Sequence, residues 1–579
     1  MILGIDLGTT NSLCAVFQDG KPALIPNAHG DILTPSVVGL LDDGQVIVGA
    51  AAKELRVTKP AQTASRFKRL MGTEQKIQIG SKHFTAPELS SLVLQSLKAD
   101  AEAFLKEAVV DVVISVPAYF NDYQRRATKF AGELAELNVL RIINEPTAAA
   151  LTYGFHDRNA DKSLLVIDLG GGTFDVTVME IFEGNLEIIS TAGESILGGE
   201  DFTDRIVSSI LKKREINFEA AELKFPMMIA RLSHECEQAK QLLSQQEQAT
   251  IRIPQQDGTF SDSPEEVTLT RESFKQETQH LLDRISRPVL KTLRDARKGI
   301  EDVGDVIFVG GATRMFLMEE FVVDKLRQTP LCEINPDEVV ALGAAVQAAL
   351  IADDRAVDDM VMTDVCPFTL GVEVSQEFGS RIVTGYFMPI IHRNTTIPVS
   401  KEDSVATIHD NQTEMSICVY QGEHRKVEGN LFLGELNVRG IPSGPKGKVV
   451  LIRFTYDMNG ILEVEAIVDQ TGKKASVVLA NHAQGLDERE LRQAVKKLQK
   501  LKYYPRDDSR NRRLLLFCEK LVGEVSPHQR EGLEMVINQY EDAMASGERE
   551  YFESARENLL IVLGELGVNY HEMDENDSE

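Results

Sequence analysis

One local pattern occurs twice in this chain and constrains its fold more than any other feature. At Leu164–Val178 an apolar run leads into Asp-Leu-Gly-Gly-Gly-Thr, and an alternating apolar pattern then resumes. At Ile2–Val16 an apolar run, Asp-Leu-Gly, small hydroxyl residues and a second apolar run follow in the same order. Apolar runs on both sides of a Gly-rich break predict two β-hairpins. Rows of backbone N–H groups in such turns bind anions, so we expect the two hairpins to close on one polyphosphate from opposite sides.

The two turns also carry the other groups that a phosphate clamp needs. Backbone and hydroxyl donors come from Thr9, Thr10, Gly171, Gly172 and Thr173. Asp6 and Asp168 end the matching strands, and Mg²⁺ is commonly held by one or two carboxylates together with waters and phosphate oxygens. A single Asp-Leu-Gly is usually an ordinary turn, but its duplication favours a metal-organising role for both carboxylates.

Three further residues fit nucleotide chemistry, although each also has an ordinary explanation. Lys68 could place a point charge on a transferring phosphate, or be a solvated surface lysine. Glu145 could orient an attacking water, or interact with the dipole of the helix that it opens. Arg314, which follows Gly310-Gly311, could stack on an adenine, but a Gly-Gly pair alone is weak evidence. These alternatives stay open on the residues alone.

The texture of the sequence changes along the chain and predicts several domains. Strands such as Val109–Val116, apolar on both faces, alternate with helical patterns up to about residue 352, which predicts an α/β sheet covered by helices. The acidic cluster at 353–359 indicates an exposed linker. Short alternating runs separated by Gly, Asn and Pro fill 366–480 and predict a β-sandwich. From residue 486 the pattern is helical and amphipathic.

Bulk composition narrows the class of protein. The net charge of −27 over 579 residues argues against nucleic acid or an anionic membrane as a partner, because phosphate binding of that kind needs a basic surface. The six cysteines include no C-x-x-C pair, which favours buried reduced thiols over a disulfide scaffold or a zinc site. No apolar run is long enough to span a membrane, and a strand is expected almost at residue 1, where a signal peptide would stand. We therefore expect a cytoplasmic protein.

Taken together, the motifs resemble those of a known family. The motifs are Gly4–Ser12, Val116–Asp122, Ile143–Ala150, Asp168–Asp175 and Gly310–Arg314. In this order they resemble the DnaK-type heat-shock chaperones over about 1–480 and, more loosely, over the helical remainder. The chain is similar to divergent, specialised bacterial members of the HscC type.

The resemblance implies an actin-like, two-lobed α/β ATPase domain, an all-β sandwich that holds extended peptide, and a short α-helical lid. The implied division is an ATPase domain at 1–357, an interdomain linker at 358–365, the peptide-binding sandwich at 366–481, the helical lid at 482–573 and a disordered acidic tail at 574–579. ATP binding should draw the linker and the sandwich onto the ATPase domain and open the peptide pocket, and hydrolysis should trap the peptide.

The resemblance also implies roles for individual residues. Catalysis falls to Lys68, Glu145, Thr173 and Asp175, while Asp6 and Asp168 organise Mg²⁺ mostly through water. The implied ATP-binding residues are Gly8, Thr9, Thr10, Asn11, Gly170, Gly171, Gly172, Thr173, Glu237, Lys240, Ser244, Gly310, Gly311, Arg314 and Asp337. Coupling between domains and to a co-chaperone is implied for Pro117, Arg125, Arg141 and Asp364. The implied peptide pocket is Val372, Val374, Ser375, Val405, Ile408, Met415 and Ile417.

The chain departs from the family pattern at several places. Gln241 stands where the family usually has a basic residue that contacts the base. The linker, Asp358–Val365, is flexible in character and less apolar than the family's run of leucines. Ser375 and Met415 differ from the commoner pocket residues. The lid is expected to be short, which predicts faster peptide release.

The resulting prediction is an ATP-dependent molecular chaperone with ATPase activity. It implies ATP or ADP and Mg²⁺ as cofactors and admits K⁺. The implied partners are unfolded or extended client polypeptides and a J-domain co-chaperone, with room for a nucleotide-exchange factor, and no nucleic acid or membrane. Two alternatives are a small-molecule kinase on the same fold, which would not need residues 366–480, and a non-enzymatic relative that acts as an exchange factor.

Overall fold

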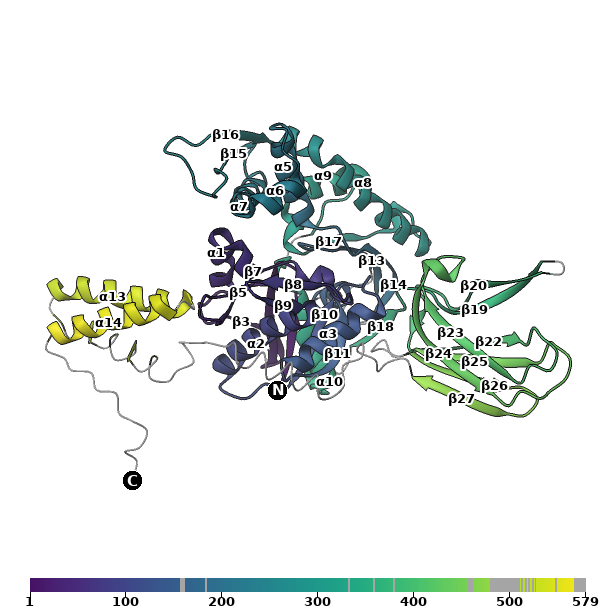
Figure 1. Cartoon of the computed structure of the whole chain (residues 1–579). Helices are drawn as coiled ribbons and strands as arrows, with labels where there is room; N and C mark the ends of the chain where they lie inside the picture. The colour runs from purple at the N-terminus through teal and green to yellow at the C-terminus, as the bar shows by residue number, and fades with distance from the viewer. Residues whose placement is uncertain are drawn as a thin grey trace, which may run out of the picture.

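Three bodies of secondary structure make up the chain (Figure 1). The computed structural model describes residues 1–156, 162–182, 185–331, 334–357, 360–378, 381–456, 462–478, 527–546 and 549–566, with individual residues between 511 and 525. A two-lobed front domain (1–357) stands at the centre. A β-sandwich lies on one side of it, and helices α13 (Pro527–Ser546) and α14 (Arg549–Glu565) lie on the other.

The first lobe is built on a mixed sheet that contains the N-terminal hairpin. In spatial order its strands are β11 (Asn138–Asn144), β10 (Asp111–Val116), β1 (Ile2–Asp6), β2 (Asn11–Gln18) and β3 (Lys21–Ile25), with β4 (Thr34–Pro35) paired to β2. β1 pairs antiparallel with β2 and parallel with β10, so the first predicted hairpin is present. Capping boxes at Thr85 and Asn121 begin helices α2 (Ala86–Leu105) and α3 (Asp122–Leu134), each satisfying free N–H groups of its first turn.

The second lobe repeats the plan around the second hairpin. Its sheet runs β17 (Asp305–Val309), β12 (Lys162–Leu169), β13 (Phe174–Phe182), β14 (Asn185–Glu194), β18 (Val361–Val365) and β21 (Thr396–Ile397). Asp168 pairs with Asp175 where β12 and β13 meet their Gly-rich turn. The main helices are α5 (Gly199–Lys212), α7 (Pro226–Leu242) and α8 (Arg271–Asp295).

Smaller elements complete the front domain. The strands are β5 (Val38–Leu40), β6 (Val46–Val48), β7 (Thr63–Ala64), β8 (Lys76–Ile79), β9 (Lys82–Thr85), β15 (Gln248–Arg252) and β16 (Glu266–Thr270). The helices are α1 (Ala50–Thr58), α6 (Phe218–Lys224), α9 (Phe316–Leu326) and the 3₁₀ helices η1 (Pro60–Gln62), η2 (Phe67–Leu70), η3 (Ile300–Asp302), η4 (Gly311–Arg314) and η5 (Arg355–Val357).

Two small-residue helices, α4 (Glu145–His156) and α10 (Val339–Ile351), hold the lobes together. α10 packs on both β1 and α4. A Cβ at Gly4 would lie 2.3 Å from the backbone nitrogen of Ala345, and one at Gly343 would lie 1.7 Å from the carbonyl oxygen of Ala148. Close backbone approach at these two glycines therefore fixes where the lobes meet.

The sandwich has two antiparallel sheets, as predicted. In spatial order the strands of the first sheet are β20 (Arg381–Ile391), β19 (Leu370–Phe378), β23 (Glu414–Gln421) and β24 (Leu431–Arg439). The 3₁₀ helix η6 (Val427–Gly429) connects β23 to β24. The second runs β22 (Val399–Ala406), β25 (Val449–Tyr456), β26 (Leu462–Val468) and β27 (Lys473–Val478). Strands β25 and β26 alternate buried and half-buried residues, the pattern of a sheet with one face on the core. Most of the predicted lid and the predicted acidic tail lie outside the described residues.

The sequence predicted a flexible, exposed linker, but the structure shows that part of it is a paired strand. Val361–Val365 form strand β18, which pairs parallel with β14 of the second lobe. The end of β18 pairs antiparallel with β21, which lies in the chain between strands β20 and β22 of the sandwich. An edge strand offers unpaired backbone groups to any passing segment, so main-chain pairing holds this linker without a run of leucines. Helix α13 lies against α1, far from the sandwich (Figure 1).

Gly343→Ala should destabilise the front domain by about 1–3 kcal/mol, because the added methyl group meets backbone that cannot move without parting α10 from α4. Gly154→Ala, in α4, is the matched control, since its methyl group would meet only side-chain atoms of Leu186. Urea unfolding of the two variants measures the difference. Equal free energies of unfolding for both variants would contradict this reading of the helix contact.

Candidate functional site

A cavity of about 720 Å³ lies between the lobes. Most residues predicted to bind or hydrolyse nucleotide line it: Asp6, Gly8, Thr9, Thr10, Asn11, Lys68, Glu145, Asp168, Gly170, Gly171, Thr173, Glu237, Lys240, Ser244, Gly310, Gly311, Arg314 and Asp337. Gly172 and Asp175 are not among the residues that line it. The sequence therefore predicted this cavity's lining from segments that lie hundreds of residues apart.

The two Gly-rich turns face each other directly. A Cβ at Gly171 would lie 1.8 Å from Oγ1 of Thr10, and a Cβ at Gly172 would lie 2.6 Å from Cγ2 of Thr9. Only glycine lets the second turn approach the first this closely. Within the first turn, the Gly8 amide donates to Oγ of Ser12 at 3.1 Å, which fixes the turn internally. The two predicted turns therefore lie against each other, as a two-sided phosphate clamp requires.

Carboxyl groups crowd the floor of the cavity around one lysine. Nζ of Lys68 donates to Oε1 of Glu145 at 2.6 Å, and both side chains are buried. Asp168 and Asp175 are also buried. Asp6 is half-buried and accepts a hydrogen bond from Oγ of Ser115 at 2.7 Å. Lys68 is thus an internal residue and not a solvated one.

Loss of solvent and mutual repulsion shift these carboxyl groups. Enclosure by protein, followed by the charge of Glu145, raises the pKa of Asp6 to about 7. The same two causes raise the pKa of Asp175 to about 7, although the Tyr119 amide donates to it at 3.2 Å. Burial and then the charges of Glu145 and Asp175 raise the pKa of Asp168 well above its usual range. Such a cluster favours either bound protons or a bound cation.

The residues at this point fit a hydrated divalent cation. Oδ2 of Asp168 is buried and has no hydrogen-bond partner, which leaves an acceptor facing the cluster. Among the described residues no group of three or more His, Cys, Asp or Glu side chains forms a ready-made metal cage. Mg²⁺ rarely uses such a cage and keeps several of its waters, so one or two carboxylates beside a phosphate site suit it.

The predicted adenosine-side residues are organised by one another. Lys240 donates to the Gly199 carbonyl at 2.7 Å and pairs with Glu237 at 2.7 Å. Gln241, which departs from the family pattern, donates to the other oxygen of Glu237 at 2.9 Å. Across the cavity Arg314 donates to Asp337 at 2.9 and 3.1 Å. A Cβ at Gly311 would lie 2.4 Å from Oδ1 of Asp337, so a larger residue there would displace the carboxylate that Arg314 holds.

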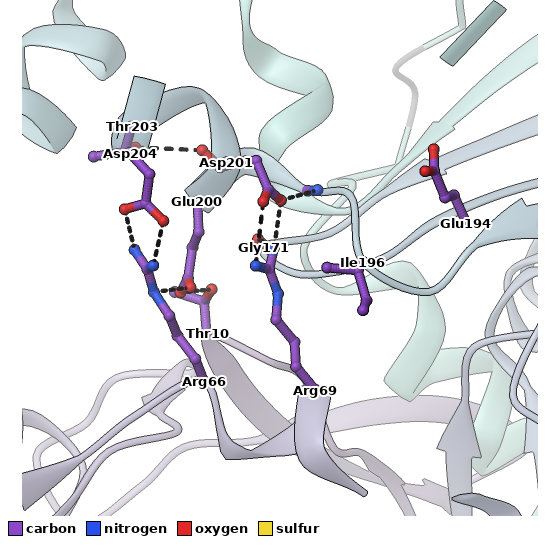
Figure 2. Close-up of polar contacts among 12 residues, drawn as sticks. Thr10, Arg66, Arg69, Gly171, Glu194, Ile196, Glu200, Asp201, Thr203 and Asp204 are labelled. Atoms are coloured by element: carbon purple, nitrogen blue, oxygen red, sulfur yellow. Dashed lines mark hydrogen bonds and ion pairs between the residues drawn. The ribbon is translucent and has the colours of Figure 1, made fainter. Parts of the chain in front are cut away.

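Several residues at the cleft were not predicted from the sequence. Arg66 and Arg69 reach from the first lobe to acidic residues at the start of α5 in the second (Figure 2). Arg69 pairs with Asp201 and donates to the Gly171 carbonyl at 3.4 Å. Two local signals were available: the arginines flank Lys68, and two acidic residues follow Gly198-Gly199.

Comparison with known proteins identifies the family. The family model described as Hsp70 protein matches residues 2–560. The chain belongs to the Hsp70 family. The chaperone protein DnaK of Mycoplasmopsis agalactiae is 39% identical to it over 547 residues, which cover 94% of this chain and 89% of that protein. Heat shock 70 kDa protein 6, chloroplastic, of Arabidopsis thaliana is 39% identical over 615 residues, which cover 98% of this chain and 83% of that protein.

Family membership confirms the main predictions. This Hsp70 protein is an ATP-dependent chaperone with ATPase activity, and it acts on client polypeptides together with co-chaperones. The predicted architecture is that of the family. The small-molecule kinase and the non-enzymatic relative are therefore set aside. In the described part of the chain, no helix has the length and apolar character of a membrane span.

Two of the predicted coupling residues, Arg125 and Asp364, are joined through Asn144 by hydrogen bonds in this Hsp70. Arg125 donates to the Ala118 carbonyl at 2.9 Å and to Oδ1 of Asn144 at 2.7 Å. Nδ2 of Asn144 donates to the linker carboxylate of Asp364 at 2.9 Å, and Thr147 donates to the same carboxylate at 3.1 Å. Burial raises the pKa of Asp364. Asn144 immediately precedes Glu145, so the linker lies one residue from the Lys68 pair.

Two predicted coupling residues lie beside this chain of bonds. Pro117 follows β10, and its carbonyl accepts from the Phe120 amide at 3.1 Å. Arg141 lies in β11, in register with Val113 of β10. Both stand on the strands whose carboxyl ends lead to the cavity.

The sandwich contacts the front domain through residues that were not predicted. Arg393 pairs with Asp295 at 3.0 Å and with Glu423 at 2.8 Å. The Thr191 amide donates to Oδ1 of Asn394 at 3.1 Å. The rings of Tyr119 and Phe368 pack at a tilt of 49° with centroids 4.5 Å apart. Asp295 and Thr191 belong to the second lobe and Tyr119 belongs to the first, so the sandwich contacts both lobes in addition to the linker strand.

Most of the predicted peptide-pocket residues lie in the sandwich core or pack against it. Val372 and Ile417 are buried in its core, and the core is flanked by Val374, Val405 and Met415. Ser375 and Ile408 are half-buried. In the described strands β19 pairs with β23 only over Leu370–Val372, so the two strands separate beside these residues.

The nucleotide-free protein should lose stability as the pH rises toward 8. The folded protein keeps protons on Asp6 and Asp175 up to a pKa of about 7, whereas the unfolded chain releases them near pH 3.8. The stabilisation from these protons is complete below the unfolded pKa and is lost as the pH rises through the folded pKa. Thermal unfolding midpoints between about pH 5.5 and pH 8 measure it.

Asp175→Asn is the control for this pH dependence, because an amide carries no titrating proton. Its midpoint should fall less steeply over the same range. An equal slope for the variant and the natural protein would show that the pH dependence arises elsewhere.

Proposed function

We propose that the cavity between the lobes is the ATP site and that its state controls the sandwich through strand β18. One observation carries the proposal: β18 extends the sheet of the second lobe, pairs with β21 of the sandwich side, and places Asp364 on Asn144 beside the Lys68–Glu145 pair. A movement of Glu145 or Lys68 at the cavity floor can therefore pass through Asn144 and strand β18 to the sandwich.

Within the cavity we assign roles to the predicted residues. The two turns bind the phosphates through their backbone and hydroxyl donors, and Lys68 places its charge on the group being transferred. Glu145 and Thr173 position the attacking water, and Asp175 accepts a hydrogen bond from it. Phosphoryl transfer of this kind depends mainly on positioning and on electrostatic stabilisation. Glu237, Lys240, Ser244, Arg314 and Asp337 hold the adenosine.

Mg²⁺ completes the site by neutralising charge on the phosphates. Asp6 and Asp168 would hold it, mostly through water, and the unpartnered oxygen of Asp168 supports this assignment. The same cluster admits K⁺ as a second ion. Asp6 and Asp168 would release their protons when the cation is present, because a nearby positive charge lowers a carboxyl pKa.

The sandwich is the proposed peptide-binding domain, at 366–481, and 358–365 is the linker. An extended apolar segment of an unfolded client would add main-chain hydrogen bonds along the edge of β19 beyond Val372 and place a side chain among Val374, Met415 and Ile417. The helical region 482–573 is the proposed lid. With α13 against α1, away from the sandwich, the arrangement is the docked, open one that ATP should favour.

We infer finer identities from the sequence. The altered linker, Ser375 and Met415 support a specialised member of the HscC type. A J-domain co-chaperone and a nucleotide-exchange factor are the proposed partners, and Pro117, Arg125, Arg141 and Asp364 are the proposed coupling residues. A cytoplasmic location fits the described cysteines, which are free thiols, because disulfides are rare in a reducing compartment.

Lys68→Ala should lower steady-state ATP hydrolysis by roughly 100-fold or more, as loss of one preorganised positive donor does at other transition states. Lys275→Ala is the control, because Lys275 makes only a surface ion pair with Glu320 at 2.6 Å. Phosphate release from ATP under saturating conditions measures both. Hydrolysis at the natural rate by Lys68→Ala would overturn the assignment of the cavity.

Asp364→Ala should uncouple the domains. The variant should hydrolyse ATP but fail to accelerate release of a bound fluorescent peptide when ATP is added, because Asn144 and Thr147 lose their linker acceptor. Asp403→Ala is the matched control, since each aspartate accepts a hydrogen bond from the next residue's amide, at 2.7 Å for Asp403 and 2.8 Å for Asp364. Peptide release that responds to ATP equally in both variants would contradict the proposed route.

A further inference from the structure

Arg66 crosses the cleft, and each of the three nitrogen atoms of its guanidinium contacts a carboxylate of the opposite lobe. Its Nη1 and Nη2 donate to the two oxygens of Asp204 at 2.6 and 3.0 Å, and its Nε pairs with Glu200. Figure 2 shows this side chain rising from the first lobe to the start of α5. Bidentate pairs of this kind fix geometry as well as charge.

Glu200 touches both halves of the phosphate clamp. Its Oε1 accepts from Oγ1 of Thr10, in the first turn, at 3.1 Å. Its backbone N–H donates to the carbonyl of Gly171, in the second turn, at 3.0 Å. Its side chain is only 11% exposed. Burial raises the pKa of the Glu200 carboxyl, and the positive charge of Arg66 opposes that rise. Arg66 therefore favours the ionised carboxylate, which accepts the hydrogen bond from Thr10.

The backbone around Arg66 shows that this placement is specific. Arg66 has a φ of 60°, a conformation that non-Gly residues seldom adopt and that surrounding contacts must compensate. It is also the N-cap of η2, the turn that carries Lys68. The residue that crosses the cleft therefore begins the same short element that presents the lysine to the cavity.

We propose that Arg66 and Glu200 are positioning residues of the nucleotide site. Arg66, held by Asp204, fixes the Glu200 carboxylate, and Glu200 keeps Thr10 of the first turn against Gly171 of the second. The clamp is thereby held closed across the lobes, and bound nucleotide leaves slowly. This inference rests on the proposed function, since it takes Thr10 and Gly171 as phosphate contacts. The Arg69–Asp201 pair supports the same closed arrangement.

The test measures release of mant-ADP from the full-length chain after excess unlabelled ADP is added. Arg66→Gln and Glu200→Gln should each release it about 10-fold faster or more, because loss of one member of a buried charge pair acts on the dissociation rate. The double variant should be little faster than the faster single variant, because the two residues act as one unit. Glu200→Gln keeps the shape of the side chain and so tests the idea even if Arg66→Gln folds poorly.

Arg205→Gln is the matched control. Arg205 lies on α5, the helix that also carries Glu200 and Asp204, and it pairs with Glu277 at 3.3 Å within the second lobe. Because this pair does not cross the cleft, Arg205→Gln should leave the rate of mant-ADP release within about twofold of the natural protein. A positioning role also predicts that single-turnover hydrolysis of bound ATP changes less than nucleotide release does. If Arg66 and Glu200 only stabilised the fold, the variants would unfold at a lower temperature, and hydrolysis and nucleotide release would change to the same extent.

The outcomes separate this inference from the proposed function. Release from Arg66→Gln and Glu200→Gln at the rate of the Arg205→Gln control, from a natural protein that binds mant-ADP, overturns the positioning role alone. A natural protein that does not bind mant-ADP, or a Thr10→Ala variant that releases it at the natural rate, overturns the assignment of the phosphate clamp and the inference with it.

Discussion

An excess of carboxyl groups over cations at one enclosed point shapes the whole front domain. Glu145, Asp168 and Asp175 are buried and Asp6 half-buried, with the ammonium group of Lys68 among them. Such a cluster costs free energy unless protons or a further cation neutralise it. The raised pKa values of the three aspartates express this constraint. A divalent cation that binds with the phosphates would neutralise these carboxyl groups and remove the repulsion between them. Nucleotide binding and the stability of the front domain are therefore linked.

Everything around this cluster depends on holding two lobes at a fixed separation. Gly4 and Gly343 let α10 approach β1 and α4 at backbone distance, below the cavity. Arg66 and Arg69 join the lobes above it. The third connection is the linker strand, which ties Asp364 to Asn144 and through β21 to the sandwich. A change in the separation of the lobes must therefore alter the contacts of the linker strand, and this is the physical basis of the proposed coupling.

Local sequence predicted the hairpins, the sandwich and the phosphate-side turns of the cavity, because Gly-rich turns and apolar strands carry their signal within about a dozen residues. The adenosine-side residues Glu237, Lys240, Ser244 and Asp337 were predicted only through the family resemblance. Lys68 was ambiguous from spacing alone and became a site residue only through resemblance. Pairs such as Arg66–Asp204, which lie 138 residues apart, depend on how the lobes pack and leave no local pattern. The same holds for Arg393 on Asp295. Strand β18 was missed for a related reason: its backbone pairing needs little apolar character, and apolar character was the signal sought.

The central claim is that nucleotide in the front cleft governs docking of the sandwich through β18. Paired labels at Glu301 in the front domain and Ser400 in the sandwich, both exposed positions, report this docking by energy transfer in the full chain. The distance should be short with ATP, when β18 lies on β14, and should lengthen when ATP is replaced by ADP. The same distance with both nucleotides would contradict the claim.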